Sequence, residues 1–200
     1  MRGRHLVIFA KAPRLGGVKR RLAAGIGGLA ALRFYREMTS RLLRRLGRDR
    51  RWRCWLFVTP DRATTGLSRW AAGVPRVRQG LGDLGQRMAR PFASLPPGPV
   101  VIIGSDIPAI RPAHIEAAFR LLAGHDVVLG PATDGGYWLI GARRRPLPYG
   151  TFACVRWSTE HALADTLASL PKGSRAVFAA TLDDVDDAAA YDLWKTLTPP

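Results

Sequence analysis

Residues 100–110 read "VVIIGSDIPAI", and this stretch decides the predicted fold. Its first four residues are all β-branched and apolar, which is typical of a strand that is covered on both faces, as in parallel sheets. Pro108 cannot donate a hydrogen bond to a neighbouring strand, so the strand is expected to end near Asp106. Pro112 stands where the first turn of a helix would begin, ahead of "AHIEAAFRLLAG".

The same alternation of strand-like and helical patterns extends in both directions from this stretch. We expect strands at 5–10, 52–58, 126–130 and 176–180, and helices at 29–46, 61–72, after 79–88, from 158 to about 170 and from 187 to 197. Ser158 and Asp187 are the expected caps of the last two helices. This alternation predicts an α/β fold with a mostly parallel sheet and helices on both faces, in one domain over residues 1–200. Only "RRRPLPYG" at 143–150 looks like a linker.

Length and cysteine content favour a soluble cytoplasmic protein. A chain of 200 residues, 47% of them hydrophobic, can bury a full core without disulfides or metals. Cys54 and Cys154 lie far apart and have no neighbouring cysteine or histidine at ligand spacing, so neither a zinc site nor a disulfide framework is indicated. The first apolar run, "LVIFA", is too short for the core of a signal peptide, and no stretch approaches the roughly 20 apolar residues of a membrane span.

The net charge of +16 would suit nucleic acid or a phosphate-bearing ligand. All but four of the 31 basic residues are arginines, and they are spread along the chain rather than clustered. We therefore expect small anionic substrates, with no nucleic acid and no membrane as partner. A homodimer is left open.

A glycine-containing basic loop follows the first predicted strand, in "FAKAPRLGGVKRRLA" at 9–23. Its two glycines lie among Lys11, Arg14, Lys19 and Arg21, so backbone amides and cations together could hold a di- or triphosphate. The loop matches neither G-x-x-x-x-G-K-[ST] nor G-x-G-x-x-G. A solvated basic loop is the alternative.

Two acidic positions are candidates for a metal site. Asp106 ends the apolar strand, and ligands of parallel α/β sheets bind beyond the carboxyl ends of the strands. A carboxylate there suits a Mg²⁺ ion that keeps several waters and bridges to substrate phosphates, although it could also cap a turn. In "LDDVDDAAAYD" at 182–192 the four acids at 183, 184, 186 and 187 could cap the last helix, or Asp186 could reach the same metal.

The stretch "VVLGPATDGGYWLIG" at 127–141 allows two interpretations. Asp-Gly and Gly-Gly are typical of a tight β-hairpin turn. Alternatively, Asp134 could accept hydrogen bonds from hydroxyl groups, Gly135 and Gly136 could let the backbone approach a ligand, and the ring of Tyr137 could cover a sugar. No Ser-His-Asp signature is present, and the four histidines occur singly.

Taken together, the motifs resemble the bacterial GT-A-like transferases that are found near radical-SAM and arsenosugar genes and are usually labelled glycosyltransferases. The resemblance covers nearly all of the chain and rests on "FAKAPRLGGVKRRLA", "QGLGDLGQRM", "IGSDIP", "LGPATDGGYWLIG", "WST" (157–159) and "LDDVDD". It implies the nucleotide-diphospho-sugar transferase superfamily, a GT-A fold and a divalent metal, Mg²⁺ or Mn²⁺.

The resemblance also implies roles for individual residues. Lys11, Lys19 and Arg21 look like the nucleotide-phosphate loop, and Asp106 and Asp186 look like the two metal aspartates. Asp134, with Gly135 and Gly136, looks like the floor of the sugar or acceptor site. Tyr137 is a further substrate-binding candidate, and Asp106, Asp134 and Lys19 are the catalytic candidates. Two departures matter: Arg20 stands where the family usually has threonine in "VKTRL", and Ser105-Asp106 is not the Asp-x-Asp of many glycosyltransferases.

The reaction stays open between two kinds of transfer. The family label favours glycosyl transfer from a nucleotide sugar. The "K…VKxRL" pattern and the wide separation of Asp106 and Asp186 look instead like nucleotidyltransferases, which join a nucleoside triphosphate to a phosphorylated acceptor and release pyrophosphate. An inactive nucleotide-binding module is a third hypothesis.

Overall fold

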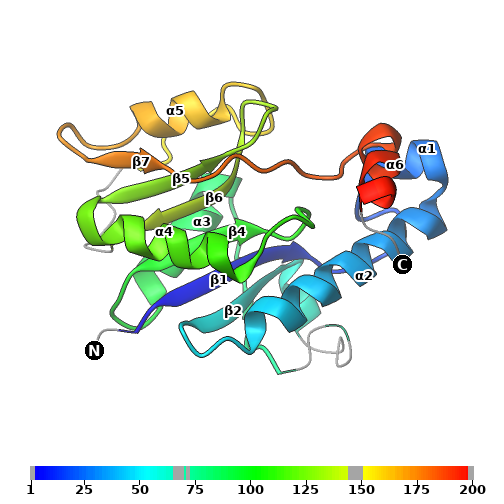
Figure 1. Cartoon of the computed structure of the whole chain (residues 1–200), viewed down its shortest axis with the longest axis horizontal. Helices are drawn as coiled ribbons and strands as arrows, with labels where there is room; N and C mark the ends of the chain where they lie inside the picture. Colours follow the sequence, from blue (N-terminus) through cyan, green and yellow to red (C-terminus); the bar gives the residue numbers. More distant parts are fainter. Residues whose placement is uncertain (1–2, 65–69, 71–72, 144–150, 198–200) are drawn as a thin grey trace.

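The computed structural model describes residues 3–64, 70, 73–143 and 151–197. In this part of the chain the strands form one sheet with the order β3-β2-β1-β4-β6-β5-β7 (Figure 1). Strand β6 runs antiparallel to β4 and β5, and the other four pairings are parallel. The strands are β1 (His5–Lys11), β2 (Arg53–Thr59), β3 (Arg76–Arg78), β4 (Val100–Gly104), β5 (Val127–Pro131), β6 (Tyr137–Ala142) and β7 (Ala176–Phe178). The predicted mostly parallel sheet is confirmed.

Helices cover both faces of the sheet (Figure 1). Successive side chains of each strand point to opposite faces, so the apolar strands carry hydrophobic side chains on both faces, and each face needs a covering layer. Leu6 and Ile8 of β1 face one core, which includes residues of α2 and α4, whereas Val7 faces a second core with residues of α3 and α5. The helices are α1 (Arg20–Ile26), α2 (Gly28–Gly47), α3 (Leu84–Ser94), α4 (Pro112–Gly124), α5 (Ala162–Ala168) and α6 (Ala188–Leu197), with a 3₁₀ helix at η1 (Asp61–Thr64). No helix in the described ranges is long and apolar enough to span a membrane.

Several elements differ from the sequence-based expectation. The helix expected at 61–72 is a 3₁₀ helix over Asp61–Thr64, and most of the remaining residues lie outside the described ranges, as do 144–150 of the linker-like stretch. The prediction that Ser158 caps α5 was wrong: the helix begins after His161, and Ser158 adopts a left-handed conformation with φ 63° in the preceding segment. The cap predicted at Asp187 is confirmed, since its Oδ1 accepts a hydrogen bond from Ala190 N at 2.8 Å.

An extended segment, 179–186, carries the chain from β7 to α6 along the edge where the parallel strands end (Figure 1). Backbone hydrogen bonds hold it there: Ala179 N donates to Leu129 O at 2.8 Å, and Val185 N donates to Asp106 O at 3.3 Å. At its end, α6 packs against α1, where Gly25 leaves room for Ala188. The acids of this segment are thereby brought to the end of β4.

Candidate functional site

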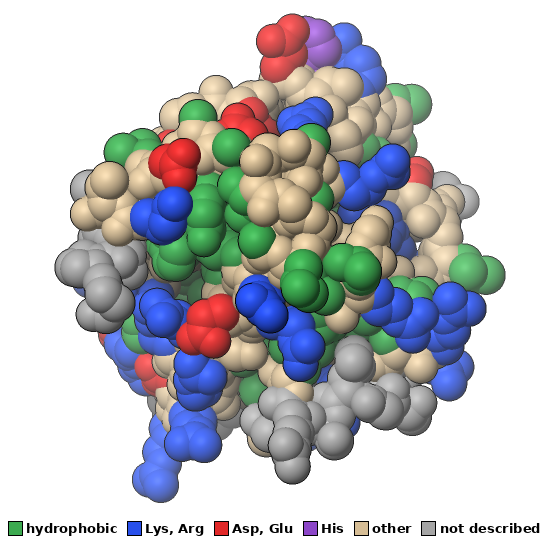
Figure 2. Space-filling model, turned by 90° about the vertical axis from the view of Figure 1, so that its right-hand side faces the viewer, with side chains coloured by type: hydrophobic (Ala, Val, Ile, Leu, Met, Phe, Trp, Pro, Cys, Tyr) green, Lys and Arg blue, Asp and Glu red, His purple; other side chains and the backbone are tan. Residues whose placement is uncertain are grey.

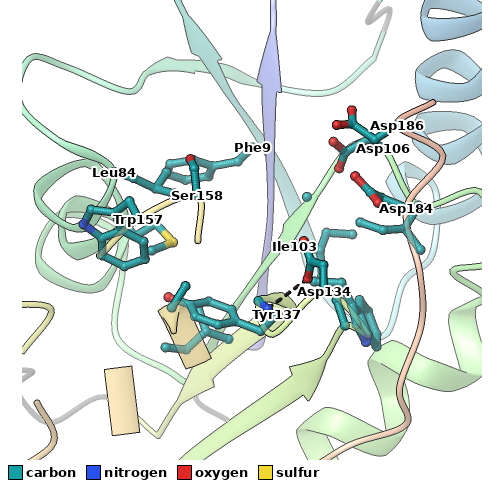
Figure 3. A pocket seen from close by; sticks show the side chains of 18 of the residues that line it. Phe9, Leu84, Ile103, Asp106, Asp134, Tyr137, Trp157, Ser158, Asp184 and Asp186 are labelled. Carbon is teal, nitrogen blue, oxygen red and sulfur yellow. Dashed lines mark hydrogen bonds between the residues drawn. The ribbon is translucent and has the colours of Figure 1, made fainter. Parts of the chain in front are cut away.

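A pocket of about 670 Å³ opens at the carboxyl ends of β1 and β4, the place where parallel α/β sheets bind ligands. Figure 2 views the molecule from this side and shows a hollow with hydrophobic side chains at its base and charged side chains on its rim. The pocket has two chemically distinct ends (Figure 3). One, the acid end, carries Asp106, Asp184 and Asp186; the other, the aromatic end, is lined by Phe9, Leu84, Met88, Tyr137 and Trp157.

Lys19 lies at the centre of the acid end. Its Nζ donates hydrogen bonds to Asp106 Oδ2 and Asp186 Oδ1, each at 3.2 Å, and lies 3.8 Å from Asp184 Oδ2. The lysine side chain is only 3% exposed, whereas those of the three acids are 38–40% exposed. Lys19 also adopts the left-handed conformation with φ 47°, which is uncommon for a residue with a side chain and is typical of functional positions.

The protonation of this cluster follows from burial and charge. Burial lowers the pKa of the Lys19 ammonium, but the three carboxylates together offset this effect, so the pKa is raised above its ordinary value. Burial is the main cause that raises the pKa of the Asp184 carboxyl to about 6, against the opposing charge of Lys19. Nearby Asp106, Asp186 and Asp134 add to that rise. The acid end therefore concentrates negative charge around a single ammonium group.

The four acids at 183–187 divide into two structural and two site residues. Asp183 Oδ1 accepts hydrogen bonds from Thr133 N at 3.0 Å and Thr133 Oγ1 at 2.7 Å, and Asp187 caps α6. Asp184 and Asp186 both reach Lys19, because alternate side chains of an extended segment share one side. Sequence reasoning identified Asp186 but passed over Asp184, although their i, i+2 spacing carried the signal.

The predicted basic loop reaches the pocket at two points besides Lys19. Lys11 and Arg21 line it, and Arg21 Nη1 lies 3.6 Å from Asp186 Oδ2. The end of β1 is fixed by the buried Tyr35, whose hydroxyl accepts a hydrogen bond from Lys11 N at 3.0 Å and donates one to Lys11 O at 2.9 Å. The same hydroxyl lies 3.2 Å from Ser105 Oγ, so one side chain ties the ends of β1 and β4 together.

The segment between β5 and β6 is a β-hairpin turn and also part of the pocket wall, so the two interpretations of its sequence are compatible. Asp134 lines the pocket, and its Oδ1 accepts a hydrogen bond from Gly136 N at 2.9 Å. Gly136 lines it too, and a Cβ there would lie 3.0 Å from Asp134 Oδ1. Gly135 is not among the lining residues: a Cβ there would lie 2.1 Å from Glu160 O, so its glycine serves internal packing.

The donor atoms at the acid end fit a divalent metal ion. Carboxylate oxygens are the ligands that Mg²⁺ and Mn²⁺ prefer, and Mg²⁺ commonly binds through only one or two of them. Asp106 and Asp186 meet this description, and a cation, the Lys19 ammonium, already lies between them. No set of three or more His, Cys, Asp or Glu side chains among the described residues is arranged to hold a metal. A divalent ion would have to compete with Lys19 for the same oxygens.

Comparison with protein families gives one match. Residues 42–159 match the family described as "Uncharacterized protein conserved in bacteria (DUF2064)". A comparison with curated proteins finds no match.

Solved structures with the same fold include several transferases. A candidate nucleotide-diphospho-sugar transferase from Desulfovibrio desulfuricans G20 is 26% identical, with a TM-score of 0.85 over 100% of this chain and 89% of that chain. The 4-diphosphocytidyl-2C-methyl-D-erythritol synthase from Anaerococcus prevotii is 12% identical, with a TM-score of 0.57 over 89% and 87%. Glucosyl-3-phosphoglycerate synthase from Mycobacterium tuberculosis, in complex with Mg²⁺ and UDP, is 14% identical, with a TM-score of 0.53 over 92% and 70%.

The last two similarities establish the fold alone. Together with the first, they confirm the predicted nucleotide-diphospho-sugar transferase fold. The first also supports the expectation of an enzyme of the transferase type.

Proposed function

The chain belongs to the bacterial family DUF2064, and we propose that it is a metal-dependent transferase that moves a glycosyl group from a nucleotide sugar to a small acceptor. The observation that carries metal-dependent transfer is the convergence of Asp106 and Asp186 on Lys19 at the carboxyl ends of the strands. The similarity to the 26% identical structure of a candidate nucleotide-diphospho-sugar transferase favours the glycosyl form of that transfer. The neighbouring solved structures support a nucleotide-activated substrate in general terms. That the chain is one of the radical-SAM and arsenosugar-associated transferases, as its motifs imply, is part of the proposal.

In the proposed reaction the basic residues hold the diphosphate of the donor. Lys11 and Arg21 line the pocket, and Lys19 can turn from the carboxylates to a phosphate oxygen once another cation neutralises those carboxylates. A divalent ion held by Asp106 and Asp186 would supply further positive charge to the leaving diphosphate. Positioning and charge stabilisation together are then the main sources of catalysis.

Asp134 is the proposed general base for the acceptor. The acceptor oxygen forms a bond to the anomeric carbon of the sugar while the bond from that carbon to the phosphate oxygen breaks. The nucleoside diphosphate leaves with the electron pair, and the Asp134 carboxylate takes the hydroxyl proton. In Figure 3, Asp134 lies between the acid end and Tyr137, as this role requires.

Nucleotidyl transfer is a second candidate, and one observation favours it. The two proposed metal aspartates come from distant parts of the chain, the end of β4 and the segment before α6, and meet at one lysine. In that reaction an oxygen of the acceptor phosphate bonds to the α-phosphorus of a nucleoside triphosphate, and pyrophosphate leaves with the electron pair of the broken bond.

Product analysis separates the two reactions. The protein is incubated with each common nucleoside triphosphate and each common nucleotide sugar, with an acceptor mixture of free and phosphorylated sugars and alcohols, in Mg²⁺, Mn²⁺ or EDTA. Free nucleoside diphosphate together with a glycosylated acceptor supports the proposal, whereas pyrophosphate release selects nucleotidyl transfer. Nucleotide binding without turnover of any donor would identify an inactive nucleotide-binding module. Asp106→Asn is the matched control, because it keeps the shape of the side chain and removes its charge.

A further inference from the structure

The aromatic end of the pocket is an apolar wall built from aromatic and aliphatic side chains. Trp157 and Tyr137 meet edge to face, with ring centroids 6.5 Å apart and ring planes at 69°. The Tyr137 hydroxyl accepts a hydrogen bond from Thr166 Oγ1 of α5 at 3.3 Å, which fixes the position of the ring. Phe9 and Leu84, labelled with Trp157 in Figure 3, line the same pocket and pack against the same core cluster as Trp157, so they complete the wall. Such a surface binds a flat or apolar body by contact with its faces.

Internal packing holds this wall in place. A Cβ at Gly85, in the first turn of α3, would lie 2.8 Å from Trp157 Cζ2 and 2.7 Å from Phe152 Cβ, so α3 lies directly against both side chains. The residue that precedes Trp157 in the chain is also fixed, because Arg156 donates two side-chain hydrogen bonds of 2.8 and 2.9 Å to Asp165 of α5. The wall is therefore formed before any ligand binds, which lowers the entropic cost of binding.

Charge disfavours an acidic acceptor at this end of the pocket, where the lining carboxylates are Asp134 and Glu160. Five carboxylates line the pocket, and its basic lining residues within the described ranges are Lys11 and Arg21. In the proposed function both cations face the donor diphosphate. Asp134 and Glu160 remain for the acceptor, and the imidazole of His161 lies 3.7 Å from Glu160 Oε1. A phosphate or carboxylate on the acceptor would meet like charges here, and like-charge contact costs binding free energy.

We propose that the acceptor is an uncharged alcohol with an aromatic or apolar body and no phosphate or carboxylate group. This inference rests on the proposed function and specifies its acceptor. The body of the acceptor contacts Trp157, Tyr137 and Phe9, and its hydroxyl reaches Asp134. Bond formation, bond cleavage and proton transfer are those of the glycosyl transfer described above. A phosphorylated acceptor, as nucleotidyl transfer would use, does not fit this charge pattern.

Matched acceptor pairs test the proposal. The full-length protein receives the nucleotide sugar that the product analysis identifies, with 1,4-benzenedimethanol, its monophosphate, glycerol or glycerol 3-phosphate as acceptor. We expect 1,4-benzenedimethanol to give a kcat/KM at least about tenfold above that of either phosphorylated compound. A preference for the monophosphate or for glycerol 3-phosphate would overturn the proposal while leaving glycosyl transfer intact. Failure of the protein to consume any nucleotide sugar would instead refute the proposed function.

Variants of Trp157 locate the acceptor body. Trp157→Ala should raise the KM for the alcohol at least about tenfold and leave the KM for the nucleotide sugar unchanged, while Trp157→Phe, which keeps a flat ring, should restore most of the loss. Trp194→Ala removes a partly buried tryptophan of α6, outside the pocket, and is the control. If the Trp157 variants weaken nucleotide binding and leave the acceptor KM unchanged, the wall binds the donor base and the proposal is wrong. If Trp157→Ala does not fold, the acceptor KM of Trp157→Phe and the preference within the acceptor pairs still test the proposal.

Discussion

Replacement of Lys19 by methionine tests whether the acid end is a cation site. Lys19 Nζ contacts Asp106 and Asp186 at 3.2 Å and Asp184 at 3.8 Å, and its side chain is 3% exposed. Methionine fills similar space without the charge, so the three carboxylates would be left facing one another. Two effects should follow: the apo protein loses stability, and its affinity for a divalent ion rises.

The loss of stability can be bounded from the exposure of the partners. Removing one partner of a buried ion pair costs roughly 3–5 kcal/mol, whereas exposed pairs are worth about 0–1 kcal/mol. Here the ammonium is buried, but the carboxylates keep 38–40% exposure, so water replaces part of the lost interaction. We expect a loss of about 2 kcal/mol in the free energy of unfolding, measured by denaturant melts in EDTA.

The gain in metal affinity is the more specific effect. A pair of unit charges about 4 Å apart is worth roughly 4 kcal/mol at an effective dielectric constant of about 20. Only part of this interaction energy has to be given up when the metal displaces the ammonium from the carboxylates. We therefore expect Mn²⁺ to bind Lys19→Met at least about tenfold more tightly than the wild type, a difference of about 1.4 kcal/mol in binding free energy. Electron paramagnetic resonance of free Mn²⁺, without nucleotide, measures this affinity directly.

Lys195→Met is the matched control, because it removes the same charge from an exposed residue of α6 that pairs with Asp192. It should change neither stability nor Mn²⁺ affinity appreciably. An unchanged or weaker Mn²⁺ affinity in a folded Lys19→Met protein would refute the reasoning that the lysine and the metal share the same carboxylates.

Three further predictions concern the residues around this cluster. Tyr35→Phe leaves two backbone groups of Lys11 without their side-chain partner and should lower the free energy of unfolding by about 1–3 kcal/mol in denaturant melts; an unchanged midpoint would contradict this. Because the pKa of Asp184 is raised from 3.8 to about 6, the native state holds its proton more tightly than the unfolded chain, and the contribution of this carboxyl to stability falls as pH rises through this window. The free energy of unfolding of Asp184→Asn, measured in EDTA, should therefore exceed that of the wild type by more at about pH 7.5 than at about pH 4. An equal difference at both pH values would argue against the raised pKa. Gly136→Ala places a Cβ 3.0 Å from Asp134 Oδ1, so it should lower kcat of the transfer reaction more than nucleotide affinity in calorimetry, and the reverse order would place Asp134 on the donor.

Much of the fold could be predicted because its core strands are continuous apolar runs. The run at 100–103 is buried in β4 between β1 and β6, so sequence and environment agree. The elements that were not predicted lack such a pattern. Strand β3 has only three residues, two of them arginines, and exists because it pairs with β2. Helix α1 has seven residues and follows Lys19, which supplies no side-chain cap.

The candidate site was predictable in part, for a similar reason. The position of Asp106 follows from the rule for parallel sheets, and the resemblance implied Lys19 and Asp186. The contact of Lys19 with Asp184 depends on how the segment 179–186 crosses the strand ends, which is a matter of tertiary structure. Likewise, the place of Trp157 depends on α3 approaching it at Gly85, and no local pattern encodes that contact.

The central claim is that Asp106 helps to bind a divalent ion that holds a nucleoside diphosphate. Calorimetric titration of ADP, CDP, GDP and UDP into the wild type and Asp106→Asn, each in Mg²⁺ and in EDTA, tests it most directly. For at least one diphosphate we expect the wild-type affinity to fall at least about tenfold in EDTA, and we expect the variant to bind weakly with no dependence on the metal. Binding of the diphosphate that is independent of metal in the wild type, or full metal dependence retained in a folded Asp106→Asn protein, would contradict the claim.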